Sequence, residues 1–205
     1  MKAEELEILR QHFPKASITM VADMYEQRHF TLKFNRPRNS KLGDFRPPRS
    51  HNGICTITLN SDLNPFQMLI TYVHEVAHYD IYQQHRTRKV RPHGQEWQAQ
   101  FSTLLQPFLT ETVFPEDILC QLRLHLQHIK ASSSADQGLQ RVLQHYDKKQ
   151  EDITTVENLP ENARFVLKNG LVFQKGEKHR TRYKCYCETN GRWYFVSSLA
   201  SVKRL

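Results

Sequence analysis

A five-residue run near the middle of the chain has the composition and spacing of a metal-binding helix. It reads His74-Glu75-Val76-Ala77-His78, with two histidines four residues apart and a glutamate directly after the first. Residues four apart lie on one face of an α-helix, so both imidazoles can bind a single ion. Neutral imidazole is a good ligand for Zn²⁺, and Glu75, about 100° around the helix, would lie beside that ion. The pattern predicts one catalytic zinc ion, with Glu75 as a general acid/base that takes a proton from water.

The third protein ligand is less determined by the pattern. His85, His93 and later members of the 11 histidines all lie within reach in a folded chain. His85 follows His78 by about two helical turns, which would place it roughly 10 Å from the metal. His93 lies between Pro92 and Gly94, where the backbone is locally restricted and a further helix is expected to begin. We therefore expect His93 to be the third ligand, in a site that also admits Mn²⁺ or Co²⁺.

The helix that carries this motif is predicted without reference to the motif itself. Asn64 is a typical N-cap residue, and Pro65 is favoured at the first helical position. A stripe of apolar residues then recurs at helical spacing: Phe66, Leu69, Ile70, Val73 and Ala77. Similar patterns predict further helices over residues 3–13, from Gly94 to about Pro107, over 115–130 and over 137–150.

Alternating segments predict two groups of strands. The residues 30–34, 42–46 and 54–60 favour a small antiparallel sheet with 42–46 as its middle strand. Two Asn-Gly pairs between apolar runs, Asn169-Gly170 and Asn190-Gly191, predict two hairpins.

Three parts of the chain are therefore expected. Residues 1–135 would form an α+β metallopeptidase domain in which helices pack on a small antiparallel sheet. Residues 136–158 would form a helical linker, because a surface helix is followed by a polar connection. Residues 159–205 would form a small, basic, all-β module.

The residues around the motif resemble the SprT-like zinc metallopeptidases, a family that includes the eukaryotic protease Spartan. The segment HEVAHYDIYQQ is similar to the HExAH helix of the family, and PHGQEW is similar to its PHGxEW element. RNSKLGDFRPP followed by ICTITLN resembles its Leu-Gly-aromatic-Arg turn and the strand before the active-site helix. The resemblance covers about residues 5–130.

This resemblance implies a minimal zincin-like fold in which two motif helices pack on a small sheet. It implies that His74, His78 and His93 hold zinc and that Glu75 is catalytic. Trp97 is similar to the aromatic residue that follows the third histidine in the family, and we expect it in the core. The resemblance does not extend to the C-terminal module, because bacterial members commonly end in a zinc ribbon with two cysteine pairs.

Cysteine content and hydropathy predict the environment of the protein. The four cysteines are sparse and unevenly placed, which favours a reducing compartment over a disulfide framework. Cys185 and Cys187 are expected as small buried side chains rather than as ligands of a second zinc ion. No uncharged stretch reaches the ~18 residues that cross a bilayer. We expect a cytoplasmic, monomeric protein without a membrane segment.

The positive charge of the chain predicts an anionic partner. The formal net charge is +8, and Lys and Arg that neutralise phosphates release counterions and so supply affinity. Members of the family that act on DNA-bound proteins use DNA as a scaffold or activator, so the resemblance implies DNA as a partner. Candidate contacts lie in the loop after the motif helix and in the C-terminal module: Arg86, Arg88, Lys89, Arg91, Arg180, Arg182, Tyr183 and Arg192.

Three functions remain open at this stage. The first is an endopeptidase whose protein substrates are bound or crosslinked to DNA. The second is a nucleic-acid-binding or regulatory protein with a structural or vestigial zinc site, although such a site has no need for Glu75. The third is a peptidase whose charge selects acidic substrates, and DNA stimulation of cleavage distinguishes it from the first.

Overall fold

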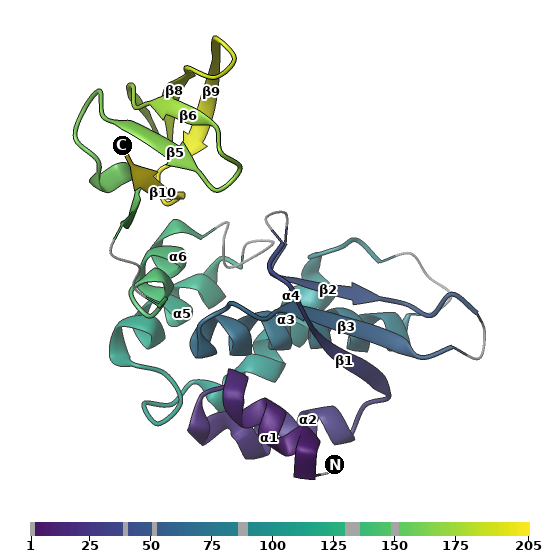
Figure 1. Ribbon diagram of the computed structural model, residues 1–205. Helices are drawn as coiled ribbons and strands as arrows, with labels where there is room; N and C mark the ends of the chain where they lie inside the picture. Colours follow the sequence, from purple (N-terminus) through teal and green to yellow (C-terminus); the bar gives the residue numbers. More distant parts are fainter. Residues whose placement is uncertain (1–2, 39–40, 51–52, 86–89, 130–135, 149–151) are drawn as a thin grey trace. The chain divides into compact units, whose positions relative to one another are not determined.

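The computed structural model describes residues 3–38, 41–50, 53–85, 90–129, 136–148 and 152–205 (Figure 1). The chain divides into two compact units, Met1–Asp147 and Lys148–Leu205. The first unit is α+β, and the second is built almost entirely from strands. None of the helices in the described ranges has the length and apolar character needed to cross a bilayer.

Six α-helices lie in the described part of the first unit. They are α1 (Ala3–His12), α2 (Ile18–Glu26), α3 (Pro65–Gln84), α4 (Gln95–Leu105), α5 (Glu116–Gln127) and α6 (Gln137–Gln144), with 3-10 turns at Lys15–Ser17 and Gln106–Phe108. The predicted start of α3 is confirmed, because the Asn64 side chain accepts a hydrogen bond of 2.9 Å from the Gln67 N–H. Helix α2 was not predicted, although its buried residues Ile18, Val21 and Met24 recur three apart, as they do on one face of a helix.

The small sheet differs from the predicted antiparallel arrangement. It contains β1 (Phe30–Asn35), β2 (Gly43–Arg46) and β3 (Cys55–Asn60), in the order β1-β3-β2. Strand β3 pairs in parallel with β1 and antiparallel with β2, so the sheet is mixed and β2 lies at its edge. The prediction of 42–46 as the middle strand is wrong because five of the six β3 residues are buried, whereas no β2 residue is. A strand covered on both faces takes the central position.

Helix α3 is the central element of the first core. It contacts β2, β3 and α4, and in Figure 1 the strands of the sheet lie across it. Eleven of its 20 residues are buried. Helix α4 adds Trp97, Phe101 and Leu105 to the same core.

The segment 136–158, expected to be a helical linker, is instead divided between the two units. Helix α6 buries Leu139 and Leu143 in the core of the first unit, because these residues lie four apart on one face. Strand β4 (Ile153–Thr155) pairs with β10 (Ser201–Arg204) in the second unit.

The second unit is the expected small all-β module. Its strands are β4, β5 (Arg164–Leu167), β6 (Val172–Gln174), β7 (Lys178–His179), β8 (Arg182–Cys187), β9 (Arg192–Ser197) and β10 (Ser201–Arg204), with a 3-10 turn at Val156–Asn158. They form one sheet in the order β4-β10-β5-β6-β8-β7, with β9 also paired to β8.

Both predicted hairpins are present in this module. The β5–β6 and β8–β9 connections contain Gly170 and Gly191 at φ of 81° and 71°, values that glycine adopts most readily. Cys185 and Cys187 lie two apart on the inward face of β8 and are fully buried, as expected. None of the four cysteines, which all lie in the described ranges, forms a disulfide bond.

Candidate metal centre

Three histidine rings of the first unit converge on one point. The Nε2–Nε2 distances are 3.2 Å for His74–His78, 3.0 Å for His78–His93 and 3.2 Å for His74–His93. Nitrogens bound to a tetrahedral zinc ion at ~2.0–2.1 Å would lie roughly 3.3 Å apart. A ring nitrogen carries one proton or one lone pair, so three of them cannot all satisfy one another. The cluster therefore fits a single cation, and it is the one group of this kind in the part of the chain that the structure describes.

A tight turn before α4 brings His93 to the two histidines of α3. His93 has a φ of 57°, a left-handed conformation in which histidine is more common than most non-glycine residues. The Gln98 side chain donates a hydrogen bond of 3.1 Å to the His93 carbonyl, and the Gly94 N–H donates one of 3.0 Å to the Arg91 carbonyl. His85, the competing candidate, is the C-cap residue of α3 and lies outside the cluster.

Trp97 packs against all three imidazoles. Its ring centroid lies 4.6 Å from that of His74, 5.2 Å from His78 and 4.7 Å from His93. The indole is 1% exposed and stacks on Phe101, so the prediction of a core residue is confirmed. The buried indole also restricts rotation of the histidine rings, which favours a preorganised site.

The environment of the cluster keeps these histidines neutral. Burial, followed by the other histidines, lowers the pKa of His74 well below its usual value. Burial and then His93 lower the pKa of His78 to about 4, and burial alone lowers the pKa of His93. At pH 7 all three rings are therefore in the neutral form that binds metal ions.

Glu75 lies between α3 and the edge strand β2. Its side chain is buried, and burial, followed by the charge of Asp44, raises its pKa to about 8, although the Phe45 N–H donates a hydrogen bond to the carboxylate. A Cβ at Gly43 would lie 2.7 Å from Glu75 Oε1, so glycine is what allows β2 to pass this close. A cation bound by the three histidines would favour the carboxylate form of Glu75.

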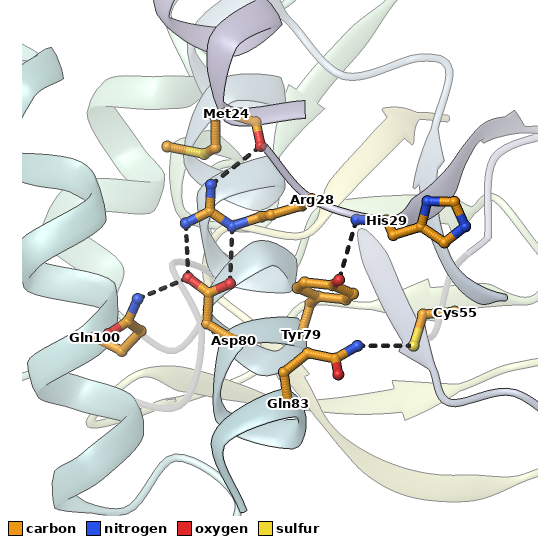
Figure 2. Close-up of polar contacts among 8 residues, drawn as sticks. All are labelled: Met24, Arg28, His29, Cys55, Tyr79, Asp80, Gln83 and Gln100. Carbon is orange, nitrogen blue, oxygen red and sulfur yellow. Dashed lines mark hydrogen bonds and ion pairs between the residues drawn. The ribbon is translucent and has the colours of Figure 1, made fainter. Parts of the chain in front are cut away.

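A buried hydrogen-bond cluster holds α3 against the end of α2 and against α4 (Figure 2). Arg28 Nε and Nη2 donate to the two oxygens of Asp80, both at 2.8 Å, and Arg28 Nη1 donates to the Met24 carbonyl. Gln100 Nε2 adds a hydrogen bond of 2.7 Å to Asp80 Oδ2. Because Gln100 lies on the helix that follows His93, Asp80 ties the two-histidine helix to the helix next to the third ligand.

The candidate nucleic-acid contacts belong to both units of the chain. Arg86, Arg88 and Lys89 lie outside the described residues, while Arg91, Arg180, Arg182 and Arg192 are exposed. Tyr183 is 9% exposed, and Lys175 Nζ lies 4.3 Å from its ring centroid. This position of β8 faces the core of the second unit, and the role of Tyr183 as a nucleic-acid contact stays a prediction.

Several residues of the centre were missed from the sequence. Gln98, Gln100 and Arg28 carry no local signal, since their partners are set by helix packing. Asp80 carried a weak local signal. It is a carboxylate two residues after His78 within a mostly apolar helix, and a buried carboxylate requires a partner.

Comparison with family models, curated proteins and solved structures found no match to this chain.

These pKa shifts predict a maximum in the stability of the metal-free protein. Below pH 6.5 the unfolded chain binds more protons at His74 and His78 than the folded chain, so their contribution is lost as the pH falls toward 4. Between about pH 4.5 and pH 8 the folded chain keeps the Glu75 proton that the unfolded chain releases, so the contribution of Glu75 is lost across this range; above pH 6.5, where the histidine effect is complete, this loss produces the decline. One titrating group changes the free energy of unfolding by about 1.4 kcal/mol per pH unit. Between pH 6.5 and pH 8, Glu75 therefore lowers the free energy of unfolding by about 2 kcal/mol.

Denaturant unfolding in EDTA across this pH range measures the effect. The Glu75→Gln variant is expected to keep the acidic decline and to lose the alkaline one. An alkaline decline of equal size in both proteins would show that Glu75 is not its cause.

Proposed function

We propose that the chain is a zinc-dependent endopeptidase in which His74, His78 and His93 hold the ion and Glu75 is the general acid/base. The observation that carries this proposal is the convergence of three neutral imidazoles, two of them on α3, the helix that also carries the buried carboxyl group of Glu75. A structural metal site has no use for that carboxyl group. Bound zinc would polarise a water molecule and a substrate carbonyl. Glu75 would take a proton from the water and deliver it to the leaving amine.

The position of β2 supports a peptide as the substrate. The Leu42 carbonyl accepts a hydrogen bond from Asn60 on β3, so the alternate residues Gly43 and Phe45 direct their peptide groups away from the sheet. The Phe45 N–H already meets the Glu75 carboxylate, so the open edge of β2 runs beside the general base. An extended peptide adds readily to such an edge.

We further propose that the substrates are proteins bound or crosslinked to DNA. The net charge of +8 and the resemblance of residues 5–130 to SprT-like peptidases support this narrower assignment. The four described cysteines are sparse and form no disulfide bond, which supports a reducing, cytoplasmic location, and we expect a monomer.

Cleavage of a DNA-binding protein by the purified, zinc-loaded chain tests the proposal. The reaction is run with single-stranded DNA, with double-stranded DNA and without DNA. Each of these reactions is repeated after a chelator has removed the zinc and again after zinc has been added back. We expect cleavage that needs zinc and is stimulated by DNA. Zinc-dependent cleavage that DNA leaves unchanged would favour a peptidase for acidic substrates. Stoichiometric zinc with no cleavage in any condition would favour a regulatory protein with a structural site.

A further inference from the structure

The β8–β9 hairpin of the second unit exposes large aromatic side chains. Trp193 and Phe195 are 59% and 55% exposed. They lie two apart on β9, so they share one face of the sheet, whereas Tyr194 between them contacts Phe173 on the other. Their partners across the ladder are Tyr186 and Lys184 of β8. Exposed aromatic residues on one face of a strand pair are costly to keep in water and point to a bound partner.

Cations are interleaved with these rings. Lys184 Nζ lies 5.1 Å from the Trp193 centroid, and the Tyr186 ring lies 5.3 Å from the same residue. His179 contacts the Phe195 ring at 5.4 Å and pairs with Arg182 of β8. We call this group the aromatic face: Arg182, Lys184, Tyr186, Trp193, Phe195 and His179. None of its members is acidic, and the whole unit has 12 Lys and Arg against six Asp and Glu.

The aromatic face makes no contribution to the core of its own unit. The inward side chains of the same two strands, Tyr183, Cys185, Cys187 and Val196, already form that core. Polar residues would therefore serve folding equally well at the outward positions. The aromatic rings are better explained by a ligand with flat apolar surfaces and negative charge.

We propose that the aromatic face binds single-stranded nucleic acid, with bases stacked on Trp193, Phe195 and Tyr186 and phosphates next to Lys184 and Arg182. Residues two apart on a strand lie about 7 Å from each other, so each ring can take its own base. Duplexes bury the faces of their bases inside the stack, so the same rings would find no surface there. The charge of the face complements the phosphates of the strand.

Binding of a labelled oligothymidylate to the full chain, followed by fluorescence anisotropy, tests this proposal. Trp193→Ala and Phe195→Ala are each expected to weaken binding roughly tenfold, as loss of one stacked base does. Lys184→Gln should reduce the dependence of the affinity on salt. The matched controls are Leu205→Ala, an exposed apolar residue, and Arg204→Gln, an exposed cation outside the face, and neither should have this effect.

Three results would overturn the proposal, provided that the variants keep the thermal unfolding transition of the parent. The first is unchanged affinity in both aromatic variants. The second is a preference for duplex DNA that is lost in these variants. The third is that the protein forms a dimer, that Trp193→Ala dissociates this dimer, and that the oligonucleotide does not change the dimer equilibrium.

The aromatic face is independent of the metal centre, so the assay is run in EDTA. Binding of the single-stranded oligonucleotide without zinc-dependent cleavage would count against the proposed peptidase function alone. Cleavage without strand binding would count against this inference alone.

Discussion

Glu75→Gln is expected to slow peptide-bond hydrolysis on the order of 10³-fold while the protein still binds one metal ion. The amide keeps the size of the side chain and cannot accept the proton of the attacking water. The three imidazoles remain in place, because His74, His78 and His93 are held by helix α3, by the turn before α4 and by Trp97. The result separates metal binding from chemistry.

Two variants make this experiment decisive. His78→Ala should lose both metal and activity, and Glu111→Gln, which changes an exposed carboxyl group of the same unit, should lose neither. Zinc content is measured by elemental analysis alongside the initial rate of cleavage. Full activity in Glu75→Gln would remove Glu75 from the reaction, and loss of zinc would make it a ligand instead.

Asp80→Ala is expected to lower the free energy of unfolding by about 3–5 kcal/mol, the usual effect of breaking a buried ion pair from one side. The side chains of Arg28 and Asp80 are 16% and 11% exposed, so the guanidinium would lose its partner where water compensates poorly. Gln100 would lose its acceptor as well. We also expect weaker zinc binding, because the same carboxylate aligns α3 with the helix that follows His93.

Denaturant unfolding in EDTA gives the stability effect, and competition with a coloured chelator gives the zinc affinity. Asp152→Ala is a matched control, because it removes a carboxylate from the exposed pair with Lys203 and should have little effect. The double variant Arg28→Met with Asp80→Leu should recover much of the stability by removing both charges. Normal stability in Asp80→Ala would show that the buried pair is not needed to hold α3 and α4 together.

Local features of the sequence were sufficient to predict the helix that carries two of the metal-binding histidines and the hairpins of the second unit. Asn64 and Pro65 mark the start of α3, and the four-residue spacing of the motif places two imidazoles on one face. The Asn-Gly pairs predict both hairpins of the second unit. Each of these features depends on residues only a few positions apart, so a short stretch of sequence contains the interaction that determines it.

The long-range features were decided by tertiary packing. The third histidine was favoured over His85 from the sequence, but its approach depends on a left-handed turn and on packing against Trp97. The central position of β3 follows from its burial, and its parallel pairing with β1 joins segments more than 20 residues apart. Arg28 and Asp80 meet across 52 positions of sequence.

The second unit shows the same division between local and long-range information. Sequence composition indicated a basic module with aromatic residues, but Tyr183 and Phe195 were not distinguished by their type. The register of β8 against β9 pairs Tyr183 with Val196 on the buried face and leaves Phe195 on the exposed face. Residue types and spacing thus determined which chemical groups this protein has, and packing between distant segments decided which of them meet, because burial depends on the whole fold.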